Sequence, residues 1–169
     1  MLASMQKADA NDAQKGEDFM HNRNTSLNTW MKQFASTHAK LDNDAEKQKA
    51  MITFVQEFDG AVKENKLSGG TFMLGKLTGN KALFSYVVSD KEQTYELKLS
   101  VSANVNDQQK ETLKEGKYYL LDGKFSWQAE KSGSGYKNGG WSGDKAAPMH
   151  LYASDINATI NSLSYMPYQ

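Results

Sequence analysis

The chain has 169 residues, enough for one domain with a sizeable core, and no cysteine, which excludes disulfides, thiolate metal sites and cysteine nucleophiles. Twenty lysines and arginines balance twenty acidic residues, so no strong field of either sign is expected. Only one basic residue, Arg23, is an arginine, which argues against a dedicated nucleic-acid binder, since such proteins usually have a basic face with several arginines.

Residues 1–23 are polar, small and charged, and they contain no apolar stretch of the kind that a signal peptide requires. We expect this segment to be a disordered leader or tether, because it cannot bury enough apolar surface to fold. No apolar run in the chain approaches the length of a membrane span.

Residues 24–67 show the spacing of two short amphipathic helices. The first begins at Thr25 or Ser26, either of which can cap it, and the second begins with Asn43 and Glu46 as a capping pair. A tight turn between the two predicts a helical hairpin whose aromatic faces belong to the core. The apolar residues that define the two stripes are Leu27, Trp30, Met31, Phe34, His38 and Leu41, then Met51, Phe54, Val55, Phe58 and Val62.

From Thr71 the hydrophobic pattern changes from a helical to a strand period, which predicts strands over about 71–77, 82–88 and 95–101. The third strand has the cleanest alternation. Its apolar residues are Tyr95, Leu97, Leu99 and Val101, and they alternate with Glu96, Lys98 and Ser100.

A short helix follows over about 107–115, with Asn106 as its cap. The fourth strand covers about 117–127, and its internal Gly123 predicts a bulge or a tight bend. The fifth strand covers about 149–156, and apolar residues in the remaining tail can pack back onto the body.

Three strands, a short helix and two more strands is the element order of the OB-fold, so residues 68–169 resemble this five-stranded barrel. With a helical hairpin in front, the chain is similar to the tRNA-anti-like OB proteins of bacterial envelopes. The resemblance implies an α+β fold in which the helix between strands three and four plugs the barrel. It also implies a ligand site on the face of strands two and three, flanked by the loops joining strands one to two and four to five. Small β-sandwiches and lipocalin-like barrels compete, but both usually need more strands.

The loop between the fourth and fifth strands, residues 128–147, contains the segment GSGYKNGGWSG. Asn138-Gly139 predicts the apex of a hairpin that would bring Tyr136 and Trp141 together. Because aromatic side chains give a large contact area at small entropic cost, this segment is a candidate binding loop. A flexible insertion is the alternative.

Two neighbouring positions extend this candidate site. Trp127 lies at the base of the loop, and Lys137 and Asn138 supply hydrogen-bonding groups. Tyr86 of the second strand joins them if Leu83 and Val87 point inward. The candidate ligand-binding residues are therefore Trp127, Tyr136, Lys137, Asn138, Trp141 and Tyr86.

Catalysis and metal binding have little support in the sequence. The three histidines, His21, His38 and His150, lie in the leader, on a helix face and at a strand start, without metal-ligand spacing. No nucleophile-elbow, phosphate-loop or HExxH pattern occurs. We expect no catalytic residues, no metal and no cofactor.

We interpret the chain as a non-catalytic binding module that recognises a protein, a peptide or a glycan through the 128–147 loop. The lack of cysteine suits an oxidising compartment, so we expect a periplasmic or cell-envelope location with a signal or lipid anchor; a cytoplasmic location is the alternative. A second hypothesis is a single-stranded nucleic-acid-binding protein. A third is a structural or assembly protein whose helical hairpin forms the interface.

Overall fold

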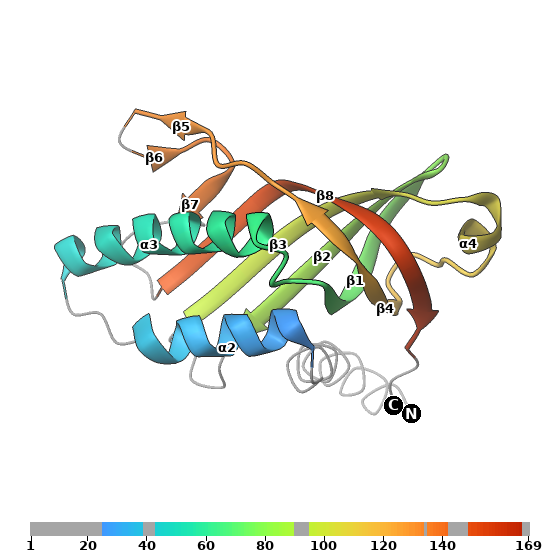
Figure 1. The fold of residues 1–169 in the computed structure, drawn as a ribbon, viewed down its shortest axis with the longest axis horizontal. Coiled ribbons are helices and arrows are strands. Elements are labelled where there is room, and N and C mark those ends of the chain that lie inside the picture. Colours follow the sequence, from blue (N-terminus) through green and yellow to red (C-terminus); the bar gives the residue numbers. More distant parts are fainter. Residues whose placement is uncertain (1–24, 39–42, 90–94, 134, 142–148, 167–169) are drawn as a thin grey trace, which may run out of the picture.

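The computed structural model describes residues 25–38, 43–89, 95–133, 135–141 and 149–166. Within these ranges two long helices precede a mostly antiparallel sheet (Figure 1), so the predicted α+β class is confirmed. The predicted leader, residues 1–23, lies outside the described residues.

The two N-terminal helices are α2, Ser26–His38, and α3, Asp44–Lys63. They run in opposite directions across one face of the sheet (Figure 1). The side chain of Asn43 caps α3 by accepting a hydrogen bond from the Glu46 N–H at 2.8 Å, which confirms the predicted helix start.

The C-terminal end of α3 is closed by a residue in the left-handed conformation. Asn65 has φ 56°, and its N–H donates to the Val62 carbonyl at 3.1 Å. The Lys66 N–H donates to the Ala61 carbonyl at 3.0 Å, so carbonyls of the last turn are satisfied. This ending fixes the position of Asn65 beside the sheet.

Within the described residues, five long strands and one short strand form the main sheet, and two further short strands form a separate two-stranded sheet. The main strands are β1 Gly69–Thr78, β2 Lys81–Ser89, β3 Tyr95–Asn104, β4 Tyr118–Ser126 and β8 Met149–Tyr165, and the short ones are β5 Lys131–Ser132, β6 Gly135–Tyr136 and β7 Gly139–Trp141. β1 pairs with β2 and with β4, and β2 pairs with β3, all antiparallel. β8 then pairs with β3 in parallel and with β4 in antiparallel fashion, so the sheet closes on itself.

β8 is longer than the predicted fifth strand, which ended at about residue 156. Its first part pairs with β3 as far as Ala158, and its second part pairs with β4 from Asn157 to Tyr165. At the transition Asp155 has φ 62°, and the register with β3 shifts. This irregularity interrupts the period of two that marks a strand in sequence, which is why the prediction stopped too early.

The strand interiors follow the predicted alternation. Leu97, Leu99 and Val101 of β3 are buried, whereas Lys98 and Ser100 are exposed. Gly123 lies at a register shift between β4 and β8, and a Cβ there would stand 2.2 Å from the Thr159 carbonyl oxygen. The bulge among the two predicted alternatives is therefore confirmed at this glycine, where β8 approaches closely.

One continuous core joins the helices to the sheet. Inside the sheet, the ring of Phe72 lies 6.2 Å from that of Phe84 and 6.1 Å from that of Phe125. On the helix side, Phe54 and Phe58 are fully buried between α2 and the sheet. Each such phenylalanine contributes about 1.5–3 kcal/mol on burial.

The helix between β3 and β4, α4, spans Asp107–Glu111 and is shorter than the predicted 107–115. It begins with a capping box in which Asn106 and Gln109 satisfy each other's N–H groups. It stops early because the hydroxyl of Tyr119 donates to the Thr112 carbonyl at 2.9 Å and accepts from the Lys114 N–H at 2.7 Å.

Candidate functional site

A cleft of about 520 Å³ lies at the base of the long loop after β4, and we call it the loop-base cleft. It is bounded by the C-terminal end of α3, the end of β4 and the transition in β8. Its lining residues are Val62, Lys63, Asn65, Lys124, Phe125, Ser126, Trp127, Gln128, Glu130, Asn138, Asp155 and Asn157.

The apolar part of the cleft is a fixed aromatic surface made by Phe125 and Trp127. The Trp127 ring meets Phe58 of α3 edge-on, at 5.1 Å between centroids. Its indole N–H donates to the Ser154 carbonyl at 2.7 Å. Because Trp127 is almost fully buried, it supports the wall of the cleft and leaves little ring surface for contact with a ligand.

Residues of the long loop hydrogen-bond to β8 just before β8 changes its pairing partner from β3 to β4. The Ser154 carbonyl accepts from Trp127, and the Ser154 N–H donates to the Asn138 carbonyl at 2.9 Å. Both backbone groups of Ser154 are therefore engaged by the loop. Asp155 follows in a left-handed conformation that non-glycine residues seldom adopt, and its exposed side chain lines the cleft.

Asn138 organises the start of the loop. Its side-chain N–H donates to the Gln128 carbonyl at 2.8 Å, and its side-chain oxygen accepts from the Glu130 N–H at 3.0 Å. The side chain is buried, so its amide is committed to the loop backbone. Asn138 therefore lines the cleft as a positioning residue.

Asn138-Gly139 is not the apex of a hairpin, contrary to the sequence prediction. The small hairpin of the loop pairs β5 with β6 instead, and Gly133 at its turn has φ 60°. Gly139 and Gly140 lie in β7, where a Cβ would meet Val55 at 3.2 Å and Met51 at 3.4 Å. The paired glycines thus bring β7 close to α3, and Gly140 has φ 134°, a conformation that favours glycine.

The other loop residues predicted for the site lie outside the cleft. Tyr136 and Trp141 are half-buried and pack against the core, and Trp141 pairs with Leu151 of β8. Lys137 is exposed beside them. The aromatic rings of this segment therefore anchor the loop to the body of the protein.

Tyr86 lies in the core, which corrects the prediction that it could face a ligand. The condition for that placement fails, because Leu83 points outward with 43% of its surface exposed. The Tyr86 hydroxyl donates to the side-chain oxygen of Asn28 on α2. Burial raises the pKa of Tyr86 far above its ordinary value, so the hydroxyl stays neutral and remains a donor.

Most of the polar side chains of the cleft were not predicted from the sequence. Seven of them have no hydrogen-bond or ion-pair partner for the side chain within the described ranges, namely Asn65, Lys124, Ser126, Gln128, Glu130, Asp155 and Asn157. One signal was available: aspartate and asparagine are depleted in strands, so Asp155 and Asn157 within an apolar strand pattern indicate an irregular, exposed position.

Metal and membrane features are not found in the described part of the chain. No group of three or more histidine, aspartate or glutamate side chains there could hold a metal ion. None of the described helices has the length and hydropathy needed to cross a membrane.

No protein-family model matches this chain, and no curated protein matches it in sequence. A function is therefore inferred from the geometry of the cleft. Amide side chains both donate and accept hydrogen bonds, a carboxylate accepts and an ammonium group donates. Their combination in one cleft can match a ligand that is rich in hydroxyl groups.

Proposed function

We propose that the protein is a non-catalytic binding module and that its loop-base cleft holds a glycan. The scaffold is an OB-type barrel with a helical hairpin in front. The closure of β1, β2, β3, β8 and β4 into one ring supports this, as does the position of α4 between β3 and β4. A glycan ligand fits the cell-envelope location predicted from the sequence.

One observation carries the proposal: several polar side chains without a partner in the described ranges line the loop-base cleft together. Asn65, Gln128 and Asn157 are exposed amides, and Asp155 is an exposed carboxylate. A sugar presents several hydroxyl groups, each a donor and an acceptor, which such side chains can match. Every matched pair contributes about 0.5–1.5 kcal/mol to binding.

The backbone that carries two of these groups is held in place without a ligand. Asn65 is fixed by the end of α3, and Asp155 follows Ser154, whose backbone is bound by Trp127 and Asn138. Preorganisation of this kind lowers the entropic cost of binding.

The single-stranded nucleic-acid hypothesis has less support. The outer face of β3 shows Glu96, Lys98 and Ser100, and Lys98 is paired with Glu96 at 3.0 Å. Stacking platforms for bases need exposed aromatic rings, and Tyr86 of the neighbouring strand is buried.

An array of bacterial and plant oligosaccharides, probed with the fluorescently labelled full chain, tests the proposal. We expect a defined set of glycans to bind, and Asn157→Ala to weaken the best of them about tenfold through lost hydrogen bonds. Because Asn157 is exposed, its replacement should leave thermal stability unchanged within about 0.5 kcal/mol.

Ser100→Ala on the outer face of β3 is the matched control and should leave glycan affinity unchanged. An array without a bound glycan, or an Asn157→Ala variant with full affinity, would contradict the proposal. Steeply salt-dependent binding of a single-stranded oligonucleotide would favour the nucleic-acid hypothesis instead.

A further inference from the structure

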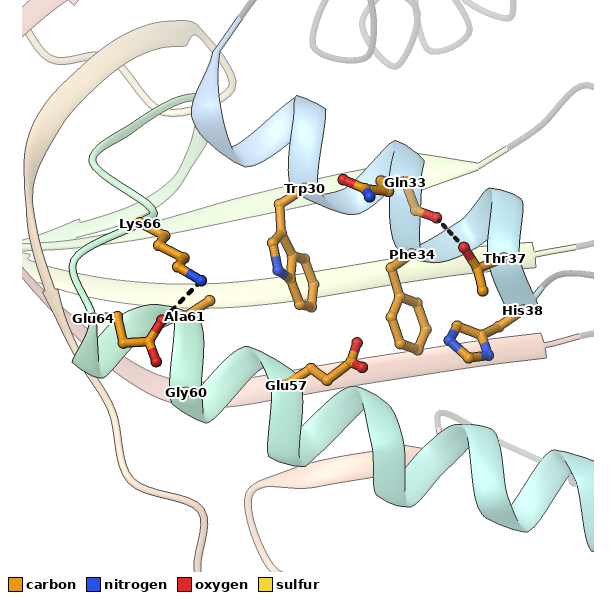
Figure 2. Close-up of a pocket in the computed structure, with 10 residues that line it drawn as sticks. All are labelled: Trp30, Gln33, Phe34, Thr37, His38, Glu57, Gly60, Ala61, Glu64 and Lys66. Atoms are coloured by element: carbon orange, nitrogen blue, oxygen red, sulfur yellow. Dashed lines mark hydrogen bonds and ion pairs between the residues drawn. The ribbon is translucent and has the colours of Figure 1, made fainter.

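A second hollow, the α2–α3 groove, runs between the two N-terminal helices and has a volume of about 590 Å³ (Figure 2). Its lining residues are Trp30, Gln33, Phe34, Thr37 and His38 of α2, Glu57, Gly60, Ala61 and Glu64 of α3, and Lys66. It shares no lining residue with the loop-base cleft.

Aromatic rings from α2 form one side of the groove. Trp30 stacks on Phe34 at 5.7 Å and 13°, and it meets Phe58 edge-on at 5.7 Å. His38 lies 4.3 Å from Phe34. Phe34 is buried, whereas Trp30 and His38 are half-buried, so the groove offers a fixed apolar surface with an exposed part at each end.

On the opposite side of the groove, α3 contributes Gly60 and Ala61 to the lining (Figure 2). Because these residues have small or no side chains, they leave space in the groove. Glycine inside a helix costs stability relative to alanine, so its presence calls for a reason. Gly60 is not among the glycines with positive φ, and a Cβ added to it would meet no atom within 4 Å. The packing of the described chain therefore gives no reason for a glycine here, whereas an occupant of the groove does.

The charge in the groove is acidic. The Glu57 carboxylate is exposed and has no partner among the described residues. Glu64 is paired with Lys66 at 2.8 Å, so this second carboxylate is compensated. The uncompensated Glu57 carboxylate attracts a cationic side chain of a ligand.

We propose that the α2–α3 groove docks an amphipathic helix of a partner protein. An apolar side chain of this helix sits between Trp30 and Gly60, and a lysine or arginine beside it reaches Glu57. A third helix can pack into the groove between two antiparallel helices, and a partly exposed tryptophan often contributes strongly to binding. A second copy of this chain fits less well, because a symmetric contact would bring two acidic grooves together.

Two synthetic helical peptides test the proposal. They share one leucine face and differ only in whether a lysine or a glutamate stands beside it. In a fluorescence anisotropy titration with the full chain, we expect the lysine peptide to bind about fivefold more tightly. Glu57→Lys should reverse this preference, whereas Glu111→Gln on the exposed face of α4 should not change it.

Gly60→Ala separates docking from folding. The added methyl group should raise the melting temperature by about 2 °C, because alanine favours the helix, and weaken the lysine peptide severalfold, because it fills the groove. Gly135→Ala is the control, since its Cβ also meets nothing within 4 Å. Absence of peptide binding, equal binding of both peptides, or full affinity in Gly60→Ala would overturn the proposal. So would self-association in sedimentation that Trp30→Glu abolishes, because the occupant would then be a second copy.

Discussion

The loop-base cleft and the α2–α3 groove both border α3, yet they are built in opposite ways. The cleft gathers polar side chains where the backbone is irregular, at Asn65 beyond the end of α3 and at Asp155 within β8. The groove lies between two regular helices, and its character comes from an aromatic ring and a glycine. Irregular backbone thus places polar side chains at the cleft, whereas the two regular helices form a groove by the packing of large and small side chains.

One buried residue connects the two regions. Phe58 contacts Trp30 of the groove at 5.7 Å and Trp127 of the cleft at 5.1 Å, both edge-on. Both surfaces are therefore supported by the same buried aromatic ring. Substitutions can distinguish the stability that this ring gives to both surfaces from effects confined to the cleft or to the groove.

Removing the shared ring should have the largest effect. Phe58→Ala leaves a cavity among Trp30, Phe54 and Trp127, and we expect a loss of about 3–5 kcal/mol in the free energy of unfolding. Denaturant unfolding followed by tryptophan fluorescence measures it. A loss below about 1 kcal/mol would show that the two regions do not share this support.

Asn138→Ala should act on the cleft side alone. It leaves the Gln128 carbonyl and the Glu130 N–H without their partner, at a cost of about 1–3 kcal/mol. Amide hydrogen exchange should show faster exchange at Glu130 and no change in α2. Lys137→Ala, at the exposed neighbouring position, serves as the control. Slow exchange at Glu130 in Asn138→Ala would contradict the positioning role.

Tyr86→Phe should act on the α2 side of the molecule and leave the loop-base cleft unaffected. It removes the hydroxyl that donates to buried Asn28, and we expect a loss of about 1–2 kcal/mol at neutral pH with glycan affinity unchanged. Because burial raises the folded-state pKa of Tyr86, its contribution is complete below the unfolded-state value of about 10 and declines above it. Unfolding across pH 8–11 should show a smaller alkaline loss of stability in Tyr86→Phe than in the unmodified chain. Identical slopes would contradict the assignment.

Asp155→Gly should have the smallest effect on stability. Glycine adopts a positive φ without strain but loses more entropy on folding, so the two terms nearly cancel and the net change stays within about 1 kcal/mol. Glycan affinity should nevertheless fall several-fold, because the carboxylate is lost from the cleft. Thermal unfolding and calorimetric titration distinguish the two effects, and unchanged affinity would remove Asp155 from the proposed site.

The sequence predicted the regular elements well because their periodicity is local. The helical stripe around Phe54 and Phe58 and the alternation from Leu97 to Val101 are properties of neighbouring residues, and both are confirmed. The early stop of α4 was missed because it depends on Tyr119, a residue beyond the helix whose hydroxyl binds the backbone of the next turn.

For the cleft, the sequence predicted a location near the loop but not most of the residues that line it. Trp127 and Asn138 do line it, but as buried supports, since their partners Ser154 and Gln128 are fixed only by the tertiary fold. Asn157 joins the site because β8 exchanges β3 for β4 at this residue. Such a change of partner involves residues far apart in sequence, so the pattern of the strand alone cannot reveal it.

An amide NMR titration of the full chain with the oligosaccharide that binds best on the array tests the glycan site most directly. We expect chemical-shift changes concentrated at Asn65, Gln128, Asp155 and Asn157, with the outer face of β3 and the α2–α3 groove unaffected. Changes centred on Lys98 and Ser100, or spread along Trp30 and Glu57, would contradict the assignment of the glycan to the loop-base cleft.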